Sequence, residues 1–218
     1  MTLKHFILIN YVQLGLSVVI LLMSAVYFRR RIIETKVIAL HFLLAFAPYL
    51  AIVFLELKGK TINIPQNIYM LVQMFTVSLL FAVVLGKKYK NLLLSLGLIY
   101  CIFWFVNFIF FQKDDLNTHT KVFGSIIFIF YCLLYYHKLL TDLPIQTLQR
   151  MPMFWYVTSN LVYNAGTLFL LLFVSYLIEV LHNDLLIYWS FHNILDIIQD
   201  LLVMVGLWQD LRNIRLHS

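Results

Sequence analysis

The sequence is poor in charge. Asp, Glu, Lys and Arg together make up 12% of the 218 residues, whereas hydrophobic residues make up 62% and the mean hydropathy is +0.88. Soluble globular domains contain about 25% charged and about 45–50% apolar residues. A chain with so little polar surface is unable to cover a water-soluble core. The composition therefore excludes a soluble globular domain and indicates an integral membrane protein, in which helices of about 20 apolar residues are the natural unit.

Glycine, proline and cysteine are also scarce. The 7 glycines and 4 prolines exclude low-complexity and fibrous chains, and the two cysteines, Cys101 and Cys132, both fall inside apolar runs. A buried cysteine behaves as a small hydrophobic residue, so we expect neither a disulfide nor a redox role. The net charge of +6 comes from basic residues in short loops. Such residues set membrane orientation and contact anionic lipid headgroups, and we expect no nucleic-acid partner.

Several catalytic and cofactor motifs are missing as well. The sequence contains no P-loop, no dinucleotide-binding glycine pattern and no Gly-x-Ser-x-Gly motif, and its last apolar run has no lysine to carry retinal as a Schiff base. These absences exclude nucleotide-dependent enzymes, serine intramembrane proteases of that type and retinal proteins. We therefore expect no organic cofactor, and a function other than catalysis is favoured.

Seven apolar runs separated by polar breaks remain. They predict an all-α, polytopic transmembrane bundle of seven helices that forms a single domain over residues 1–218, with no soluble domain. The first run is too long for the apolar region of a cleavable signal peptide and is followed by three arginines, so it is predicted to be a first span. The runs are Phe6–Phe28, Val37–Leu57, Ile68–Leu85, Leu92–Phe111, Val122–Tyr136, Phe154–Leu181 and Leu185–Trp208.

The distribution of Lys and Arg predicts the orientation. Of the 16 basic residues, 11 follow the first, third, fifth and seventh runs and 5 lie on the other side. Because cytoplasmic loops carry the excess of Lys and Arg, this count predicts an amino terminus outside and a carboxyl terminus in the cytoplasm of a multi-pass protein of the cell membrane. The alternative is six spans followed by a charged helix that lies on the membrane surface.

The last run carries its polar residues on one side. In the stretch "YWSFHNILDIIQDLLVMVGLW", His192, Asp196 and Asp200 are spaced four residues apart. Nearly all polar residues of this stretch fall in an arc of about 140° on a helix, and they are Tyr188, Trp189, His192, Asn193, Asp196, Gln199 and Asp200. The sixth run behaves similarly, with Asn160, Asn164, Thr167, Ser175 and Glu179 on one face. A tight "HND" turn makes these two runs antiparallel neighbours, so we expect their polar faces to meet.

Carboxylates inside a span require an explanation. An aspartate at the centre of a span costs about 2.5–3.5 kcal/mol, and no Lys or Arg lies within any apolar run. The interior bases are His41 and His192. We therefore expect Asp196 and Asp200 to be protonated, to bind a cation, to pair with imidazolium or to face water. The candidate ligand- or ion-binding residues are His192, Asp196, Asp200, Gln199, Asn160, Asn164, Glu179 and His41.

Three function classes, and a purely structural role, fit this pattern. We favour a sensor- or receptor-like protein in which a polar cavity between the last two helices binds a small molecule or ion and a signalling partner binds at the cytoplasmic face. The alternative is a proton- or cation-coupled carrier of small solutes. A metal-dependent intramembrane hydrolase is less favoured, because it would need about three His ligands. In the structural role, the polar residues only hold helices together in lipid.

Overall fold

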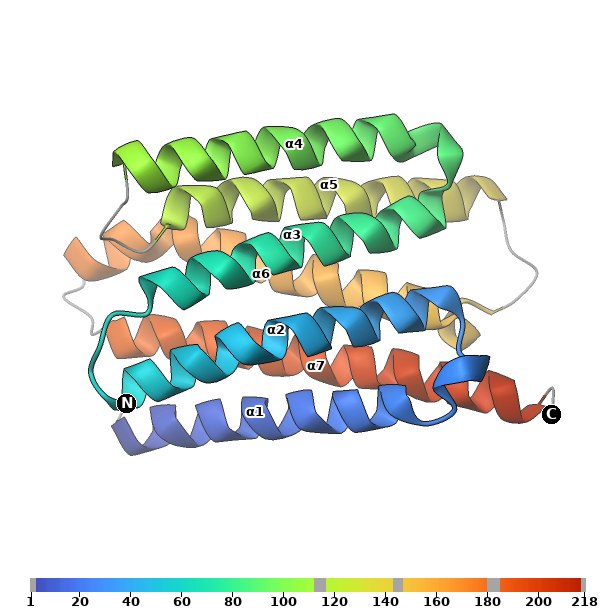
Figure 1. Cartoon of the computed structure of the whole chain (residues 1–218), viewed down its shortest axis with the longest axis horizontal. Helices are drawn as coiled ribbons and strands as arrows, with labels where there is room; N and C mark the ends of the chain where they lie inside the picture. The colour runs from blue at the N-terminus through green and yellow to red at the C-terminus, as the bar shows by residue number, and fades with distance from the viewer. Residues whose placement is uncertain (1–2, 112–116, 143–146, 180–184, 217–218) are drawn as a thin grey trace. The chain divides into compact units, whose positions relative to one another are not determined.

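The computed structural model describes residues 3–111, 117–142, 147–179 and 185–216, and they form helices without any β-strand (Figure 1). Short 3-10 turns and one π-helical turn, η3 (Asn107–Phe111), lie between or beside the long helices. The seven α-helices are α1 (Leu3–Ala25), α2 (Ile33–Leu57), α3 (Asn63–Leu85), α4 (Lys90–Val106), α5 (Thr118–Asp142), α6 (Pro152–Glu179) and α7 (Leu185–Leu216).

Six of these helices are long and apolar enough to cross a membrane, namely α1 to α6. The prediction of an all-helical, seven-helix, membrane-spanning architecture is confirmed to that extent. In the part of the chain that is described, α7 is not among the six. Its 32 residues include five charged ones, Asp196, Asp200, Asp210, Arg212 and Arg215. The orientation of the termini stays a prediction.

The chain divides into two compact units. The first comprises Met1–Arg31 and Leu143–Ser218, and it contains α1, α6 and α7. The second comprises Ile32–Asp142, and it contains α2 to α5. The first unit thus joins the two ends of the chain, whereas the second is continuous in sequence. The expectation of a single domain stays a prediction.

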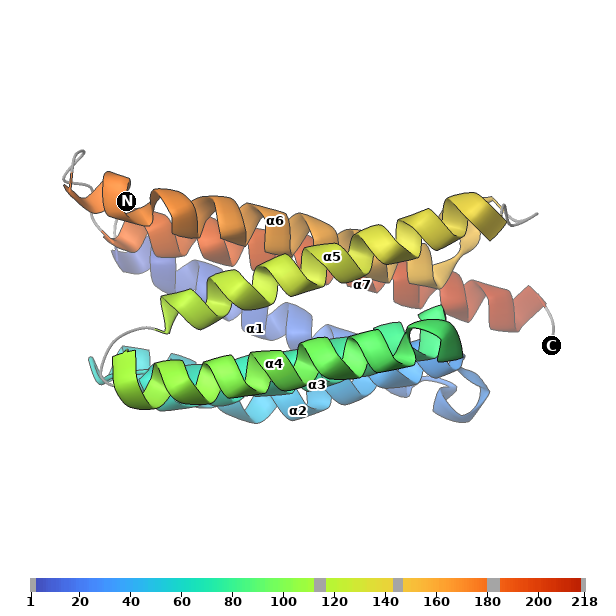
Figure 2. The ribbon, with the colours of Figure 1, turned by 90° about the horizontal axis from the view of Figure 1, so that it is seen from above.

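In the first unit, α7 packs against both α1 and α6 (Figures 1 and 2). Helices α6 and α7 are antiparallel and close together at two glycines. A methyl group placed on Gly166 would lie 2.7 Å from Leu195 Cδ1, and one on Gly206 would lie 2.7 Å from Tyr156 Cδ1 and 3.1 Å from the Pro152 carbonyl oxygen. Small residues allow such close approach between membrane helices. At these two levels side chains fill the seam between α6 and α7.

In the second unit, α3 contacts α2, α4 and α5 and supplies much of the buried core, including Met74, Leu80 and Phe81. The Phe81 ring lies 5.4 Å from the ring of Tyr131 on α5. At the carboxyl end of α3, the Lys138 ammonium of α5 donates a hydrogen bond to the Val84 carbonyl at 2.8 Å. A cation at the end of a helix satisfies free carbonyls and interacts favourably with the helix dipole.

The other end of the second unit holds a buried amide cluster. The side-chain oxygen Oδ1 of Asn67 accepts from the Trp104 indole at 3.1 Å and from the Asn117 side-chain amide at 2.7 Å. The Asn107 amide, at the start of η3, donates to Asn117 and, at 3.3 Å, to Thr120. These groups are mutually paired, so the cluster joins α3, α4 and the start of α5 at a depth where unpaired amides would be costly.

Candidate functional site

The centre of the candidate site is a His–Asp pair on α7 in the first unit. His192 Nδ1 lies 3.1 Å from Asp196 Oδ2, and His192 Nε2 lies 3.4 Å from the Tyr163 hydroxyl of α6. The Tyr163 and His192 rings meet edge to face, with centroids 5.7 Å apart. His192 is 6% exposed and the Asp196 side chain 12% exposed. The pair is therefore removed from bulk solvent and is held from two sides.

Asp200, one turn beyond Asp196, is in a different situation. It is 7% exposed, and among the described residues its carboxyl group has neither a hydrogen-bond donor nor an ion-pair partner. The flanking helices supply no compensating charge, because residues 8–25 of α1 and 152–173 of α6 include no acidic or basic side chain. Within residues 8–25, 152–173 and 190–208, His192 is the one basic side chain, and it already contacts Asp196. The two carboxyl groups therefore share a single base.

The polar arc of α7 lies between its two neighbours. At about 100° per residue, His192 and Gly206 mark the face toward α6, and Asn193, about 100° from His192, marks the face toward α1. The Asn193 amide donates to Asn10 of α1 at 2.5 Å. Asp196 and Asp200 fall between these faces. The exposed apolar residues lie on the opposite side of the helix and are Phe191, Ile194, Ile198, Leu201 and Trp208.

Asn160 and Asn164 lie on α6 and are 3% and 2% exposed. Each amide donates to its own helix, Asn160 to the Tyr156 carbonyl at 3.0 Å and Asn164 to the Asn160 carbonyl at 2.8 Å. The Oδ1 atom of Asn160 and the Oγ1 atom of Thr167 are buried without a hydrogen-bond partner in the described part of the chain. No hydrogen bond there joins either asparagine to His192, Asp196 or Asp200.

The remaining predicted site residues are placed as follows. Gln199 is partly exposed on α7. The side chain of Glu179 lies outside the described residues. His41 belongs to the second unit, where its Nδ1 atom lies 2.7 Å from Thr76 Oγ1. Since the Thr76 hydroxyl donates to the Val72 carbonyl at 2.7 Å, it accepts from His41, which fixes the imidazole with its hydrogen on Nδ1.

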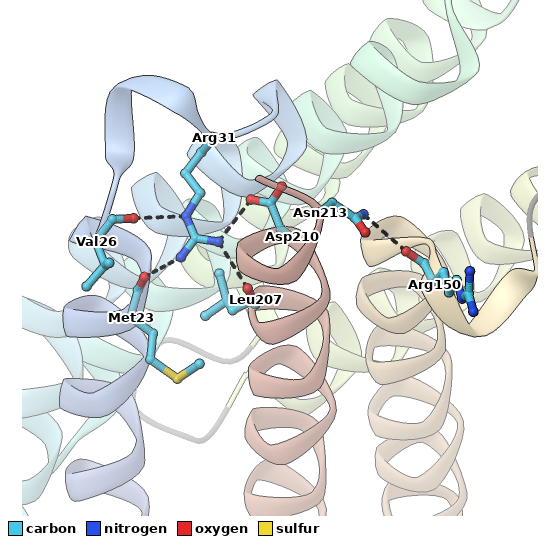
Figure 3. Close-up of polar contacts among 7 residues, drawn as sticks. All are labelled: Met23, Val26, Arg31, Arg150, Leu207, Asp210 and Asn213. Carbon is cyan, nitrogen blue, oxygen red and sulfur yellow. Dashed lines mark hydrogen bonds and ion pairs between the residues drawn. The ribbon is translucent and has the colours of Figure 1, made fainter. Parts of the chain in front are cut away.

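An ion pair that the sequence analysis did not predict lies further along α7 (Figure 3). Arg31 Nη1 contacts Asp210 Oδ2 at 3.1 Å, and the two side chains are 0% and 1% exposed. The same guanidinium donates to the Leu207 carbonyl at 3.0 Å, to the Val26 carbonyl at 3.1 Å and to the Met23 carbonyl at 2.5 Å. We call these contacts the Arg31 clasp, because they join the end of α1 to α7.

Arg31 was missed because an arginine triplet after an apolar run is typical of an exposed cytoplasmic loop. Arg29 and Arg30 are indeed exposed. Asp210 carried a usable signal. It lies on almost the same side of an α-helix as His192, five turns away, so its inward direction follows from the 3.6-residue period.

No group of three or more His, Cys, Asp and Glu side chains in the described residues is arranged to hold a metal ion. No protein-family model matches the chain, and neither a curated protein nor a solved structure matches it. Function is therefore inferred from the geometry and chemistry of the site alone.

Proposed function

We propose that this chain is a sensor- or receptor-like membrane protein whose input is a proton bound at the α7 cluster of His192, Asp196 and Asp200. The carboxyl group of the buried residue Asp200, which has no partner among the described residues, carries this proposal. A buried carboxylate that lacks a counter-charge is much costlier than the neutral acid, and a second carboxylate one turn away adds repulsion. Protonation relieves both costs. Proton binding at the cluster therefore stabilises the conformation in which these residues are buried.

A proton fits this cluster better than a metal ion does. The His192 imidazole is already engaged by Asp196 and Tyr163, at 3.1 Å and 3.4 Å. A metal site needs several ligands directed at one point, and no group of three or more His, Cys, Asp and Glu side chains in the described residues is arranged in this way. Imidazole and carboxyl groups in hydrogen-bonding contact are the usual elements of a pH-responsive site.

The output would pass along α7. Asp200 lies ten residues from Asp210, about 15 Å along the helix, and Asp210 belongs to the Arg31 clasp. A change in the packing of α7 at the cluster would reach the helix end that the charge count places in the cytoplasm. A partner protein that reads the position of this end would complete the sensor.

Thermal unfolding in detergent micelles at several pH values tests the proposal. The midpoint of unfolding of the wild-type protein should rise as the pH falls from about 8 to about 5, because the folded state gains protons that the unfolded state does not bind as tightly. Asp200→Asn keeps the shape of the side chain and removes its charge. It should raise the midpoint at pH 8 and flatten the dependence on pH.

Asp142→Asn, at an exposed position at the end of α5, is the matched control and should leave the wild-type curve unchanged. Asp200→Asn with the same pH slope as the wild type would contradict the proposal and leave helix packing as the role of the cluster. His192→Gln should lower the slope further when combined with Asp200→Asn, since it removes the second titrating group.

The second candidate is a proton-coupled carrier. It is favoured by the one-turn spacing of Asp196 and Asp200, which allows a proton held by one carboxyl group to pass to the other. Proteoliposomes that contain a pH-sensitive dye separate the two candidates. Proton entry that starts when a small solute is added, and that Asp200→Asn abolishes, identifies a carrier, whereas pH-dependent stability without flux for any solute in a panel identifies a sensor.

A further inference from the structure

The polar residues of α6 lie level with those of α7. Tyr156 meets Gly206 and Gly166 meets Leu195, so each residue forward on α6 corresponds to one residue backward on α7. Interpolation places Asn160 opposite position 201 or 202 and Asn164 opposite position 197 or 198. At about 1.5 Å rise per residue, Asn160 is within about 3 Å of the level of Asp200, and Asn164 of the level of Asp196.

Both sets of side chains also lie on the same side of the seam. On α6, the positions that contact α7 (Tyr156, Tyr163 and Gly166) are centred about 80° from the mean direction of Asn160, Asn164 and Thr167. On α7, the positions that contact α6 are centred about 95° from Asp196 and Asp200, in the direction of increasing angle in both helices. In an antiparallel pair, equal rotations of this kind lead to the same side. The six residues Asn160, Asn164, Thr167, His192, Asp196 and Asp200 therefore form one polar band.

Two oxygen atoms in this polar band have no hydrogen-bond partner within the described ranges of the chain. Asn160 Oδ1 and Thr167 Oγ1 lie two turns apart, on residues that are 3% and 0% exposed. A buried polar atom without a hydrogen bond is expensive, and polar positions of this kind are where proteins bind ordered water. Asn164, between them, already donates within α6.

We propose that the polar band binds a chain of hydrogen-bonded water molecules that relays the proton between the level of Thr167 and Asp200. This inference rests on the proposed function, because it concerns the proton bound by the same cluster. Each water in the chain accepts one proton and releases another to its neighbour, so an excess proton moves while the water oxygens stay in place, and the waters then rotate back to their starting orientation. The oxygens of Thr167 and Asn160 anchor the two ends by accepting hydrogen bonds from water.

The charged and titratable groups around the band are few. From α6, the Tyr163 phenol faces His192 at 3.4 Å, and from α1 the neutral Asn10 amide faces Asn193. The ion pair of Arg31 and Asp210 is internally neutral and lies about 15 Å from Asp200 along α7. The ionisable groups of the polar band itself are therefore His192, Asp196 and Asp200, with Tyr163 as a hydrogen-bonding neighbour.

A pH jump followed by time-resolved infrared spectroscopy tests the relay. The infrared absorption of a carboxylic acid that is lost in Asp200→Asn reports the protonation of Asp200 in the purified full-length protein. Thr167→Val keeps the volume of the side chain and removes the hydroxyl, and Asn160→Leu removes the amide. Loss of one hydrogen-bonded anchor should raise the barrier to proton transfer by about 1.4 kcal/mol. The carboxylic acid absorption of Asp200 should then appear about tenfold more slowly.

The equilibrium titration of the Asp200 carboxylic acid absorption is recorded for each variant as well, so that a change in rate is separated from a change in equilibrium. Ser159→Ala is the matched control, because the Ser159 hydroxyl is buried on the same helix and donates to the Tyr156 carbonyl at 2.8 Å. Thr167→Ser, which keeps a hydroxyl, should restore the rate. Each of these outcomes supports the relay.

Rates in Thr167→Val and Asn160→Leu that match Ser159→Ala would overturn the relay and leave the proposed function standing. If the wild-type protein shows no pH-dependent carboxylic acid absorption that is lost in Asp200→Asn, the relay and the proposed function are both overturned. Retention of the helical circular dichroism spectrum shows that each variant is folded. If Thr167→Val or Asn160→Leu does not fold, the other variant is sufficient for the test.

Discussion

At the scale of single residues, Arg31 makes polar contacts to four different groups of the first unit. Its guanidinium is completely buried and meets three backbone carbonyls and one carboxylate. The carbonyls of Met23 and Val26 come at the end of α1, where the last carbonyls have no partner within the helix. Tyr27, with φ of 54° in the left-handed region, begins the turn that returns Arg31 to this helix end. Arg31 thus caps α1 and neutralises Asp210 at once.

We predict that Arg31→Met destabilises the protein more than Asp210→Asn does. Arg31→Met leaves a buried carboxylate without a counter-charge, which costs about 3–5 kcal/mol. Asp210→Asn leaves the guanidinium with its three carbonyl acceptors and should cost about 1–3 kcal/mol. The free energy of unfolding in SDS titrations of the micellar protein measures both.

Arg30→Met is the control, because Arg30 is exposed one residue away. The double variant Arg31→Met/Asp210→Leu removes both charges and should recover part of the loss. Equal stability of the Arg31→Met and Arg30→Met proteins would show that the buried ion pair contributes nothing to the fold.

At this scale the sequence was informative where periodicity was strong. The inward direction of His192, Asp196 and Asp200 followed from a spacing of four residues. The partners of Arg31 did not, since they are backbone carbonyls and a carboxylate 179 positions away. Likewise, nothing in the local sequence indicates that Asn193 meets Asn10 or that Asn67 meets Asn117. Such pairs depend on which helices become neighbours.

At the scale of helices, α7 is the element that joins the first unit. It runs parallel to α1, since Asn193 is opposite Asn10 and Leu207 is beside the end of α1. It runs antiparallel to α6, and Asn213 donates to the Arg150 carbonyl at 3.3 Å (Figure 3). The apolar run that predicted this helix ended at Trp208, whereas α7 continues to Leu216. Hydropathy indicates which residues are favourable in lipid. It does not indicate the residue at which a helix ends.

We predict that Gly206→Ala destabilises the protein by about 1–3 kcal/mol, as overpacking does in a close-packed interior. The added methyl group would meet the Tyr156 ring and the Pro152 carbonyl oxygen, and backbone atoms are unable to rotate away. The free energy of unfolding measures the effect. Gly15→Ala is the control, because nothing lies within 4 Å of the new methyl group. It should stabilise α1 by about 0.5–1 kcal/mol through its helix propensity.

The partner of the clash gives a second test. In the background of Tyr156→Leu, a smaller side chain leaves room for the methyl group, so Gly206→Ala should cost less than it does in the wild type. Equal costs in the two backgrounds would show that α6 and α7 do not depend on close approach at Gly206.

At the scale of the whole molecule, the sequence predicted the number and class of helices better than their grouping. Runs of about 20 apolar residues are a local signal, and the helices found correspond to the seven runs. The association of α1 with α6 and α7 is not local, because residues 32–142 separate these helices in the chain. Glycine contacts, amide pairs and the Arg31 clasp determine it, and none of them is visible as a pattern in one segment.

The contacts of the first unit also bear on whether α7 crosses the membrane. The Arg31 clasp holds the carboxyl end of α7 at the carboxyl end of α1, and the Asn213 contact holds it at the start of α6. These three helix ends therefore lie at the same end of the first unit, and α7 runs in the same direction as α1 between the Asn10–Asn193 contact and the Arg31 clasp. A helix of 32 residues, about 48 Å long, reaches across a hydrocarbon core if it follows α1. If α7 crosses the membrane, its carboxyl groups are accommodated, because Asp196, Asp200 and Asp210 point away from the arc of exposed apolar residues.

Cysteine labelling in intact cells tests this topology together with the predicted orientation. In a background with Cys101 and Cys132 replaced by Ala, we expect a cysteine at Lys60 to react with an impermeant maleimide from outside. Cysteines at Arg30, Lys88 and Arg212 should react only after permeabilisation, because the positive-inside rule places these basic positions in the cytoplasm. All four positions are exposed, so burial does not prevent the reaction.

Labelling of position 212 from outside, with position 30 still protected, would mean that α7 does not cross, and it would contradict the contact between the ends of α1 and α7. Labelling of positions 30, 88 and 212 from outside, with position 60 protected, would instead keep seven spans and reverse the orientation. The charge count of 11 against 5 would then not decide the insertion of this chain.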